Sequence, residues 1–216
     1  MKKIALPILL LLCSACTERE FTPRNGDLLF QVGADSPMRD AIREATAEGH
    51  AVPFTHAALV EVVDGSVSVI EATGDGGVRR TSLPEFLERS ADIDGRPVAA
   101  VFRLRPEVAT ESEIATSVRR AAGFIGQPYD YSFLPDNGCM YCSELVYESY
   151  RRDDGTPIFT ARPMNFRAPD GSMPAFWTEL FARLGEEIPE GVPGTNPADM
   201  AAEGCLIKVF DYTAAE

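Results

Sequence analysis

The chain carries little positive charge. Its 216 residues include 20 Lys and Arg against 33 Asp and Glu, which gives a formal net charge of −13. The acidic residues are scattered along the chain rather than gathered in blocks. Binding to nucleic acid requires a basic surface that neutralises phosphates, so we expect no nucleic-acid partner. We interpret the acidity as that of a solvated protein surface.

The N-terminal apolar run is too short to cross a bilayer. It covers only residues 4–12, whereas a membrane span takes roughly 20 apolar residues. Two lysines precede it and small residues follow it, which is typical of a signal peptide. Its end, "CSAC", resembles the lipobox of bacterial lipoproteins, in which signal peptidase cuts before a cysteine that becomes diacylated. We therefore predict a lipoprotein signal peptide over residues 1–15, lipidation of Cys16 and a tether over residues 16–25.

Two other interpretations of this segment remain. Cleavage before Cys13 would place Leu12 where small residues are expected, and an ordinary secreted protein would be cut near Ala15. Thr17 follows the predicted lipid site, so the Asp that retains some lipoproteins at the inner membrane is absent. We therefore expect a location in the cell envelope, lipid-anchored at the periplasmic face of the outer membrane.

Cysteine and histidine are scarce, with five and two residues. A structural zinc site needs about four ligands, and the "CMYC" pair formed by Cys139 and Cys142 has no second pair, so we predict no metal and no cofactor. A redox couple would normally follow a strand in a thioredoxin-like βαβ unit, which the neighbouring segments do not suggest. A disulfide between Cys139 and Cys205 stays open, because an oxidising compartment would allow it.

The pattern of segments predicts a single α+β domain over residues 26–216. Asp64-Gly65 lies between two β-branched runs and predicts a hairpin over residues 54–73 with a two-residue type I′ turn. Ser36 and Pro37 predict the start of a helix that ends at Gly49. The remaining expected elements are strands at 26–33 and 96–105, helices at 83–89, 110–126, 142–152 and 173–184, and a C-terminal helical turn followed by a last strand.

The hairpin brings His56 and Glu71 together. If the turn lies at Asp64-Gly65, opposed positions sum to 129, so His56 faces Thr73 and Glu71 lies diagonally on the same side of the sheet. A carboxylate there can set the tautomer of the imidazole and raise its basicity. A lone histidine on an apolar strand can also be a buried core residue, so the position by itself does not decide its role.

Cys142 opens a predicted helix directly after a glycine-containing loop. An unperturbed cysteine with a pKa of ~8.5 is only about 3% thiolate at pH 7. A helix N-terminus and a protonated histidine favour the thiolate, and the amides at that terminus can receive the oxyanion of a tetrahedral intermediate. Cys142, His56 and Glu71 therefore have the chemistry of a nucleophilic centre.

These residues lie in segments that resemble a known family. "GDLLFQ", "THAALVEV", "VIEAT", "GFIGQPYDYSF", "YCSELVYESY" and "NPADM" occur in the order expected of the permuted NlpC-type hydrolases, the papain-like amidases and peptidases of the YiiX/YaeF group. The resemblance covers roughly residues 26 to 210. It implies a papain-like fold in which an antiparallel β-sheet packs against the helix that begins at the nucleophile. It also implies Cys142 as nucleophile, His56 as base and Glu71 as the residue that orients the base.

Two tyrosines precede the nucleophile. A phenol at Tyr129 or Tyr131 can support the oxyanion or line the pocket, and each is equally compatible with an aromatic core position. The Gly-rich segment "TGDGGVRR" departs from the family pattern and can reshape the rim of the site. It lacks the spacing and the lysine of a phosphate-binding loop.

Three functions are compatible with these residues. The first is a cysteine hydrolase that cleaves amide bonds in peptides such as cell-wall stem peptides. The second is an acyl hydrolase or acyltransferase acting on lipids, and the third is a binding lipoprotein without catalysis. A polar groove with charged groups beside Cys142 would favour the first, and a deep apolar slot would favour the second.

Overall fold

The computed structural model describes residues 21–46 and 48–214. The predicted signal peptide and the predicted lipidation site, Cys16, lie outside the described residues. Within those ranges, every helix is too short or too polar to pass through a bilayer.

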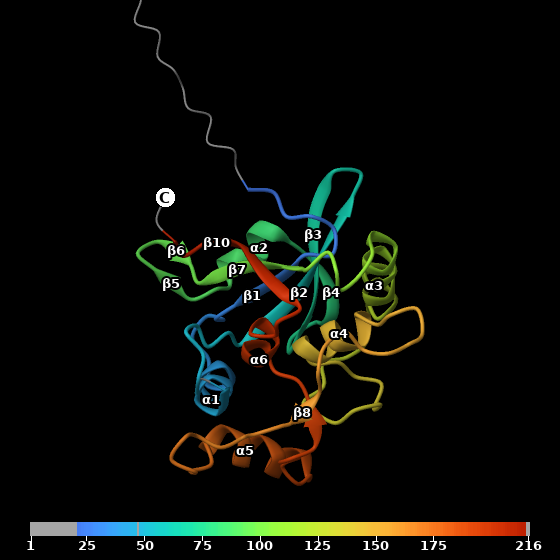
Figure 1. Ribbon diagram of the computed structural model, residues 1–216. Coiled ribbons are helices and arrows are strands. Elements are labelled where there is room, and N and C mark those ends of the chain that lie inside the picture. Colours follow the sequence, from blue (N-terminus) through green and yellow to red (C-terminus); the bar gives the residue numbers. More distant parts are fainter. Residues whose placement is uncertain (1–20, 47, 215–216) are drawn as a thin grey trace, which may run out of the picture.

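A six-stranded antiparallel sheet forms the centre of the domain, with the strand order β10-β7-β1-β2-β3-β4 (Figure 1). Its strands are β1 (Leu28–Gln31), β2 (His56–Val63), β3 (Ser66–Thr73), β4 (Gly77–Ser82), β7 (Ala99–Leu104) and β10 (Leu206–Asp211). Two short ribbons pair β5 (Asp92–Ile93) with β6 (Arg96–Pro97) and β8 (Arg162–Pro163) with β9 (Pro193–Gly194).

Helices cover both faces of this sheet and extend beyond one end of it (Figure 1). α4 packs on β2 and β3, with α3 beside it, whereas α2 packs on β3 and β4 and α1 packs on α5. The helices are α1 (Pro37–Thr46), α2 (Leu83–Glu88), α3 (Glu111–Gly123), α4 (Cys142–Ser149), α5 (Ala175–Leu184) and α6 (Pro197–Ala201). The predicted α+β class, with an antiparallel sheet against the helix that begins at Cys142, is confirmed.

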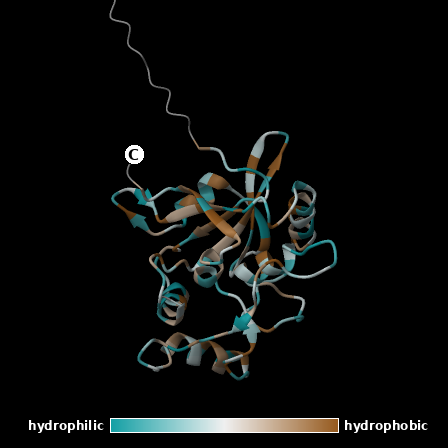
Figure 2. Cartoon of the chain, in the orientation of Figure 1, coloured by the Kyte–Doolittle hydropathy of each residue, from teal (hydrophilic) through white to brown (hydrophobic). Residues whose placement is uncertain are grey.

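Side chains alternate along the strands, so the sheet has an apolar core on each face. Leu28 and Phe30 belong to the core under α4, whereas Leu29 and Val60 pack with Phe86 of α2 on the other face. Figure 2 shows hydrophobic residues, in brown, along the central strands. This burial on both faces explains why the strands are rich in Val, Leu, Ile and Ala.

The predicted hairpin is present with the predicted register. Asp64 and Gly65 have φ values of 49° and 80°, as a type I′ turn requires. Ala58 pairs with Glu71 across β2 and β3, so opposed positions sum to 129. Glu71 is therefore placed diagonally from His56 on one face of the sheet.

The end of the predicted tether packs onto the domain. The ring of Phe21 stacks on that of Phe210 in β10, with 4.4 Å between centroids. Pro23 is buried, and the backbone N–H of Arg24 donates to the Asp27 carboxylate at 2.7 Å. The folded part therefore includes residues 21–25, the end of the segment 16–25 that is predicted to be a tether.

Gly77, the first residue of β4, lies against the chain that leads to the nucleophile. Its φ is +61°, and a Cβ atom built on it would lie 2.2 Å from the backbone oxygen of Gln127. We expect Gly77→Ala to lower the free energy of unfolding by about 3 kcal/mol, because φ is unfavourable and backbone has to move. Gly95→Ala is the matched control, since φ is +77° there but nothing lies within 4 Å; it should cost only about 1 kcal/mol. Equal losses in urea denaturation would contradict this packing argument.

Candidate active site

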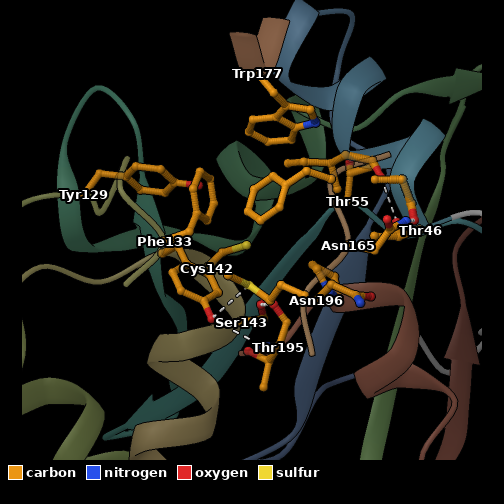
Figure 3. Close-up of a pocket in the computed structure, with 16 residues that line it drawn as sticks. Thr46, Thr55, Tyr129, Phe133, Cys142, Ser143, Asn165, Trp177, Thr195 and Asn196 are labelled. Atoms are coloured by element: carbon orange, nitrogen blue, oxygen red, sulfur yellow. Dashed lines mark hydrogen bonds between the residues drawn. The ribbon is translucent and has the colours of Figure 1, made fainter. Parts of the chain in front are cut away.

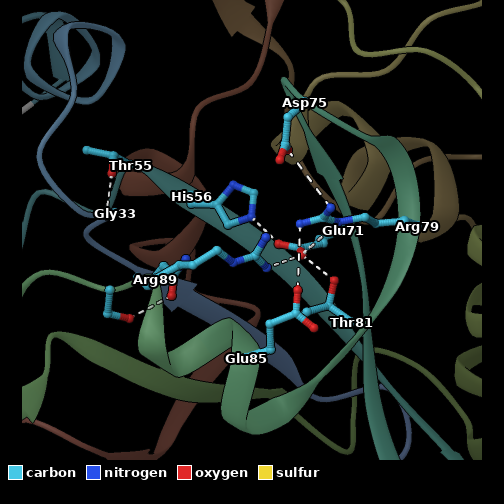
Figure 4. A network of polar contacts seen from close by, with 11 residues as sticks. Gly33, Thr55, His56, Glu71, Asp75, Arg79, Thr81, Glu85 and Arg89 are labelled. Carbon is cyan, nitrogen blue, oxygen red and sulfur yellow. Dashed lines mark hydrogen bonds and ion pairs between the residues drawn. The ribbon is translucent and has the colours of Figure 1, made fainter.

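His56 and Glu71 form a hydrogen-bonded pair at one end of the sheet (Figure 4). His56 begins β2, and its Nε2 lies 2.8 Å from Oε2 of Glu71. The His56 side chain is 16% exposed, whereas Glu71 is fully buried. The imidazole also stacks on Phe86, with ring centroids 5.8 Å apart. The ring is therefore held on one side by a carboxylate and on one face by an aromatic residue.

Glu71 has other partners besides His56. Thr81 donates its hydroxyl to Oε1 at 2.5 Å, Arg89 donates to the same oxygen, and the Nε atom of Arg79 lies 3.6 Å away (Figure 4). Burial by itself would raise the pKa of Glu71, but hydrogen bonds from His56, Thr81 and Arg89 lower it to about 2. The carboxylate is thus held ionised next to the histidine.

The sequence patterns above do not indicate these additional partners. Arg79 is directly opposite Glu71 in the β3–β4 pair, and Thr81 lies two residues further along the same strand. Treating "GVRRTS" as a third strand of the hairpin would have placed both beside Glu71 by the period-2 rule. Arg89 follows α2 and reaches Glu71 only through the tertiary fold, so spacing alone does not reveal it.

Cys142 is the buried first residue of α4. Tyr141 before it is extended, with φ −90° and ψ 169°, so the chain turns into the helix at the thiol. Burial alone would lower the pKa of His56, but hydrogen bonding to Cys142 and Glu71 outweighs burial and raises it to about 10. Because Nε2 is bound to Glu71, Nδ1 is the nitrogen left for Cys142. The three predicted residues therefore meet in space.

The two predicted tyrosines differ in their surroundings. The Tyr131 hydroxyl donates to the backbone oxygen of Gly74 at 2.8 Å, which ties the loop before the nucleophile to the turn between β3 and β4. Tyr129 packs on Tyr131, with ring centroids 4.9 Å apart, and lines both cavities described below. Of the two, Tyr129 is thus the residue next to Cys142.

The other thiols lack the partners that Cys142 has. Cys139, Cys142 and Cys205, the cysteines in the described part of the chain, are free, so the disulfide left open by the sequence is not formed. Burial, with nearby Asp130 and Glu144, raises the pKa of Cys139. Burial also raises the pKa of Cys205, to about 11. Both thiols are therefore protonated at neutral pH.

An apolar slot opens on one side of Cys142 (Figure 3). Its volume is about 60 Å³. Its wall includes aromatic and aliphatic side chains from α1, α5 and the loops around α4, namely Ile42, Ala45, Phe133, Tyr141, Met164, Phe166 and Trp177. Uncharged polar residues, namely Thr46, Thr55, Ser143, Asn165, Thr195 and Asn196, line it as well. The rings of Phe133 and Phe166 pack edge-on against Trp177, with centroids 5.5 and 5.1 Å away. This packing fixes the width of the slot.

A wider, polar groove opens on the other side of Cys142. Its volume is about 420 Å³. It contains the His56–Glu71 pair, and its charged or polar walls include Gln31, Ser36, Arg39, Asp75 and Arg89. Cys142 and Tyr129 belong to both cavities. The nucleophile therefore lies where a slot without charged side chains meets a groove that contains several.

A thiol at a helix N-terminus, facing a histidine that a buried glutamate orients, is the arrangement of a papain-like cysteine hydrolase. Here the histidine and the glutamate precede the cysteine in the chain, so the order is permuted relative to papain.

Comparison with known proteins agrees with this class. The model of the permuted papain-like amidase family YaeF/YiiX, C92, matches residues 22–210. The chain belongs to this family, which makes it a hydrolase of the amidase type and confirms the predicted resemblance. YiiX of Escherichia coli K12 is 27% identical over 167 residues, which cover 77% of this chain and 76% of YiiX.

A solved structure shares the fold. It is described as the crystal structure of metalloprotein YiiX from Escherichia coli O157:H7, and it has a TM-score of 0.71 and 24% identity over 88% of this chain and 98% of that chain. Within residues 21–46 and 48–214 of the present protein, no group of three or more His, Cys, Asp or Glu side chains is arranged to hold a metal ion.

Proposed function

We propose that the protein is a cysteine amidase of the cell envelope that hydrolyses amide bonds in peptides, including cell-wall stem peptides. The observation that carries this proposal is the polar groove that contains His56 and ends at Cys142. Peptides have a polar backbone and charged ends, which need hydrogen-bonding and charged partners when they are bound. Arg39, Asp75 and Arg89 supply such partners along the groove.

The proposed mechanism is a two-step acyl transfer through a thioester. The Cys142 thiolate attacks the carbonyl carbon, and the amides at the start of α4, with Tyr129 beside them, are placed to receive the oxyanion. His56 gives its proton to the leaving amine as the C–N bond breaks. It then takes a proton from water, which hydrolyses the thioester, releases the acid and restores the thiolate–imidazolium pair. Glu71 keeps the ring oriented throughout.

The apolar slot supports the lipid-directed alternative less strongly. An acyl chain would find apolar walls there, but the volume of about 60 Å³ is less than half of the ~150 Å³ cavity that holds benzene in an engineered protein core. A long chain would have to extend out of the slot into solvent. We therefore rank hydrolysis or transfer of lipid acyl groups second.

We also propose that Cys16 carries a lipid anchor and that the enzyme works at the periplasmic face of the outer membrane. The basic start, the short apolar run and the "CSAC" segment support this location. Phe21, five residues after Cys16, packs on Phe210 of the domain, so a domain anchored at Cys16 would stay close to the membrane surface.

A substrate panel tests the proposed function. The purified full chain would be incubated with soluble stem peptides and, separately, with phospholipid vesicles, and products would be identified by mass spectrometry with Cys142→Ala as the blank. We expect the wild type to cleave amide bonds in the peptides and Cys142→Ala not to cleave them. Cleavage of lipids alone would favour the second function. Peptide or lipid binding without any turnover dependent on Cys142 would instead indicate a binding lipoprotein.

A further inference from the structure

The two cavities at Cys142 differ in their access to the general acid. His56 and Glu71 line the polar groove, and neither lines the apolar slot. Cys142, Thr55, Ile42 and Tyr129 are shared by both. A substrate whose carbonyl carbon lies at the Cys142 sulfur therefore has two directions to extend, and only one of them passes the histidine.

The chemistry of amide cleavage decides which half of the substrate takes which direction. The leaving nitrogen must receive a proton as its bond to carbon breaks, and the donor has to be within hydrogen-bond distance of that nitrogen. His56 is that donor in the proposed mechanism, so the amine half has to lie on the groove side. The acyl half then points away from His56, toward the slot.

The slot limits the size of the group that it accepts. Because a cavity of ~150 Å³ holds the six carbons of benzene, the enclosed volume of about 60 Å³ holds roughly two or three carbon atoms. Trp177, which is 2% exposed, lies among its walls, and the edge-on rings around it leave little room for expansion. The branched end of an aliphatic side chain such as that of valine or leucine fits this space. The groove, at about 420 Å³, has room for a larger, polar amine half.

We propose, on the basis of the proposed amidase function, that the preferred substrate joins a compact apolar acyl residue, held in the slot, to a polar amine residue, held in the groove. Ala45 and Trp177 are then specificity-determining residues for the acyl half. The substrate class is a peptide amide with a Val- or Leu-like residue on the carbonyl side of the scissile bond.

Mirrored substrates test the direction of binding. The full chain would be given N-acetyl-leucyl-lysine amide and N-acetyl-lysyl-leucine amide, and kcat/KM for cleavage between the two residues would be compared. We expect the first to be preferred at least about tenfold, as a buried aliphatic side chain usually gives. Quenched reactions should show the N-acetyl-leucyl group on Cys142 by mass spectrometry. A preference for the second amide would overturn the proposal.

A slot-filling variant tests the location. In Ala45→Leu, the preference for the leucyl over a glycyl acyl residue should fall about tenfold, whereas Glu44→Leu, an exposed neighbour on α1, should keep it. If Ala45→Leu does not fold, Trp177→Phe enlarges the slot and should shift the preference toward larger acyl residues. A preference unchanged by slot filling, in a folded variant, would overturn the proposal.

A second readout separates this proposal from the proposed function. Chloromethyl ketones of N-acetyl-leucine and N-acetylglycine alkylate a thiol and release chloride, so labelling of Cys142 needs no amide turnover. Suppose that no amide is cleaved, that the leucine reagent labels the wild type faster than the glycine reagent does, and that the two reagents label Ala45→Leu at the same rate. The amidase function then fails, whereas the assignment of the slot to the acyl residue stands. Equal labelling rates in the wild type would reject the slot.

Discussion

Replacing His56 with alanine is expected to slow Cys142-dependent turnover about a thousandfold, the usual contribution of a general acid–base residue. The same change should sharply lower the rate at which iodoacetamide alkylates Cys142 near neutral pH. The reason lies in the His56 pKa of about 10, which keeps the imidazole protonated beside the thiol. An imidazolium favours the reactive thiolate, and alanine removes this charge.

The alkylation experiment has a matched control. His50 is the other histidine, and its Nε2 is 2.8 Å from Asp199 rather than next to Cys142. His50→Ala should leave the alkylation rate of Cys142 unchanged. Peptide mapping would separate the label on Cys142 from label on Cys139. Equal alkylation rates in the wild type and His56→Ala would show that the thiol is not activated by this histidine, and the binding-lipoprotein function would then move to first place.

Replacing Glu71 with glutamine is expected to lower the free energy of unfolding at neutral pH by about 3 kcal/mol. Glutamine has the same shape, but it leaves His56, Arg89 and Arg79 without their shared counter-charge. The pKa of Glu71 falls from the ordinary 4.5 to about 2 on folding. By proton linkage, this difference corresponds to a contribution of roughly 3 kcal/mol to the free energy of unfolding, which agrees with the expected loss. Urea denaturation monitored by circular dichroism measures the loss.

The dependence on pH distinguishes the lost charge from a packing defect. Because the folded-state pKa of Glu71 is depressed, its stabilising contribution is complete above pH 4.5 and is lost as the pH falls from 4.5 through about 2. The difference between the wild type and Glu71→Gln should therefore shrink over that interval. Glu88→Gln removes an exposed carboxylate and should change stability little at any pH. A difference that stays constant on acidification would indicate that Glu71 contributes through shape alone.

The contribution of His56 to stability depends on pH in the opposite direction. Its pKa is raised from 6.5 to about 10, so its contribution to stability is complete below pH 6.5 and is lost as the pH rises through about 10. Glu71→Gln removes one of the two partners that raise this pKa, so the alkaline loss should also be smaller in the variant. The same denaturation series, continued to alkaline pH, records both effects.

Local sequence signals accounted for the parts of the site that neighbouring residues determine. The turn at Asp64-Gly65 sets the β2–β3 register, because both residues adopt positive φ at little cost, and that register places Glu71 beside His56. Ser36 caps α1, with the Arg39 N–H 3.1 Å from its Oγ, as the start signal predicted. Such contacts depend on a few residues close in the chain.

Local sequence signals do not predict contacts between segments that are distant in the chain. Arg89 reaches Glu71 from the end of α2, and the slot joins α1 to α5, which are more than a hundred residues apart in the sequence. The sequence contains aromatic residues at these positions. The residue type alone, however, does not distinguish a ring in the hydrophobic core from a ring in the wall of a pocket. Only the packing of helices shows which rings border a cavity.

The sequence by itself indicated the family, through the resemblance of its segments, and the α+β class. It also predicted that His56 lies beside Glu71 and that Cys142 opens a helix, because strand alternation, turn chemistry and helix starts are local properties. The tertiary structure decided what surrounds them. It brought Arg89 to the buried carboxylate, where Thr81 and Arg79 also lie, and it made a slot without charged side chains and a groove with charged side chains meet at the thiol. These features follow from how the sheet, α1 and α5 pack together, and packing depends on the shapes of side chains from the whole chain at once.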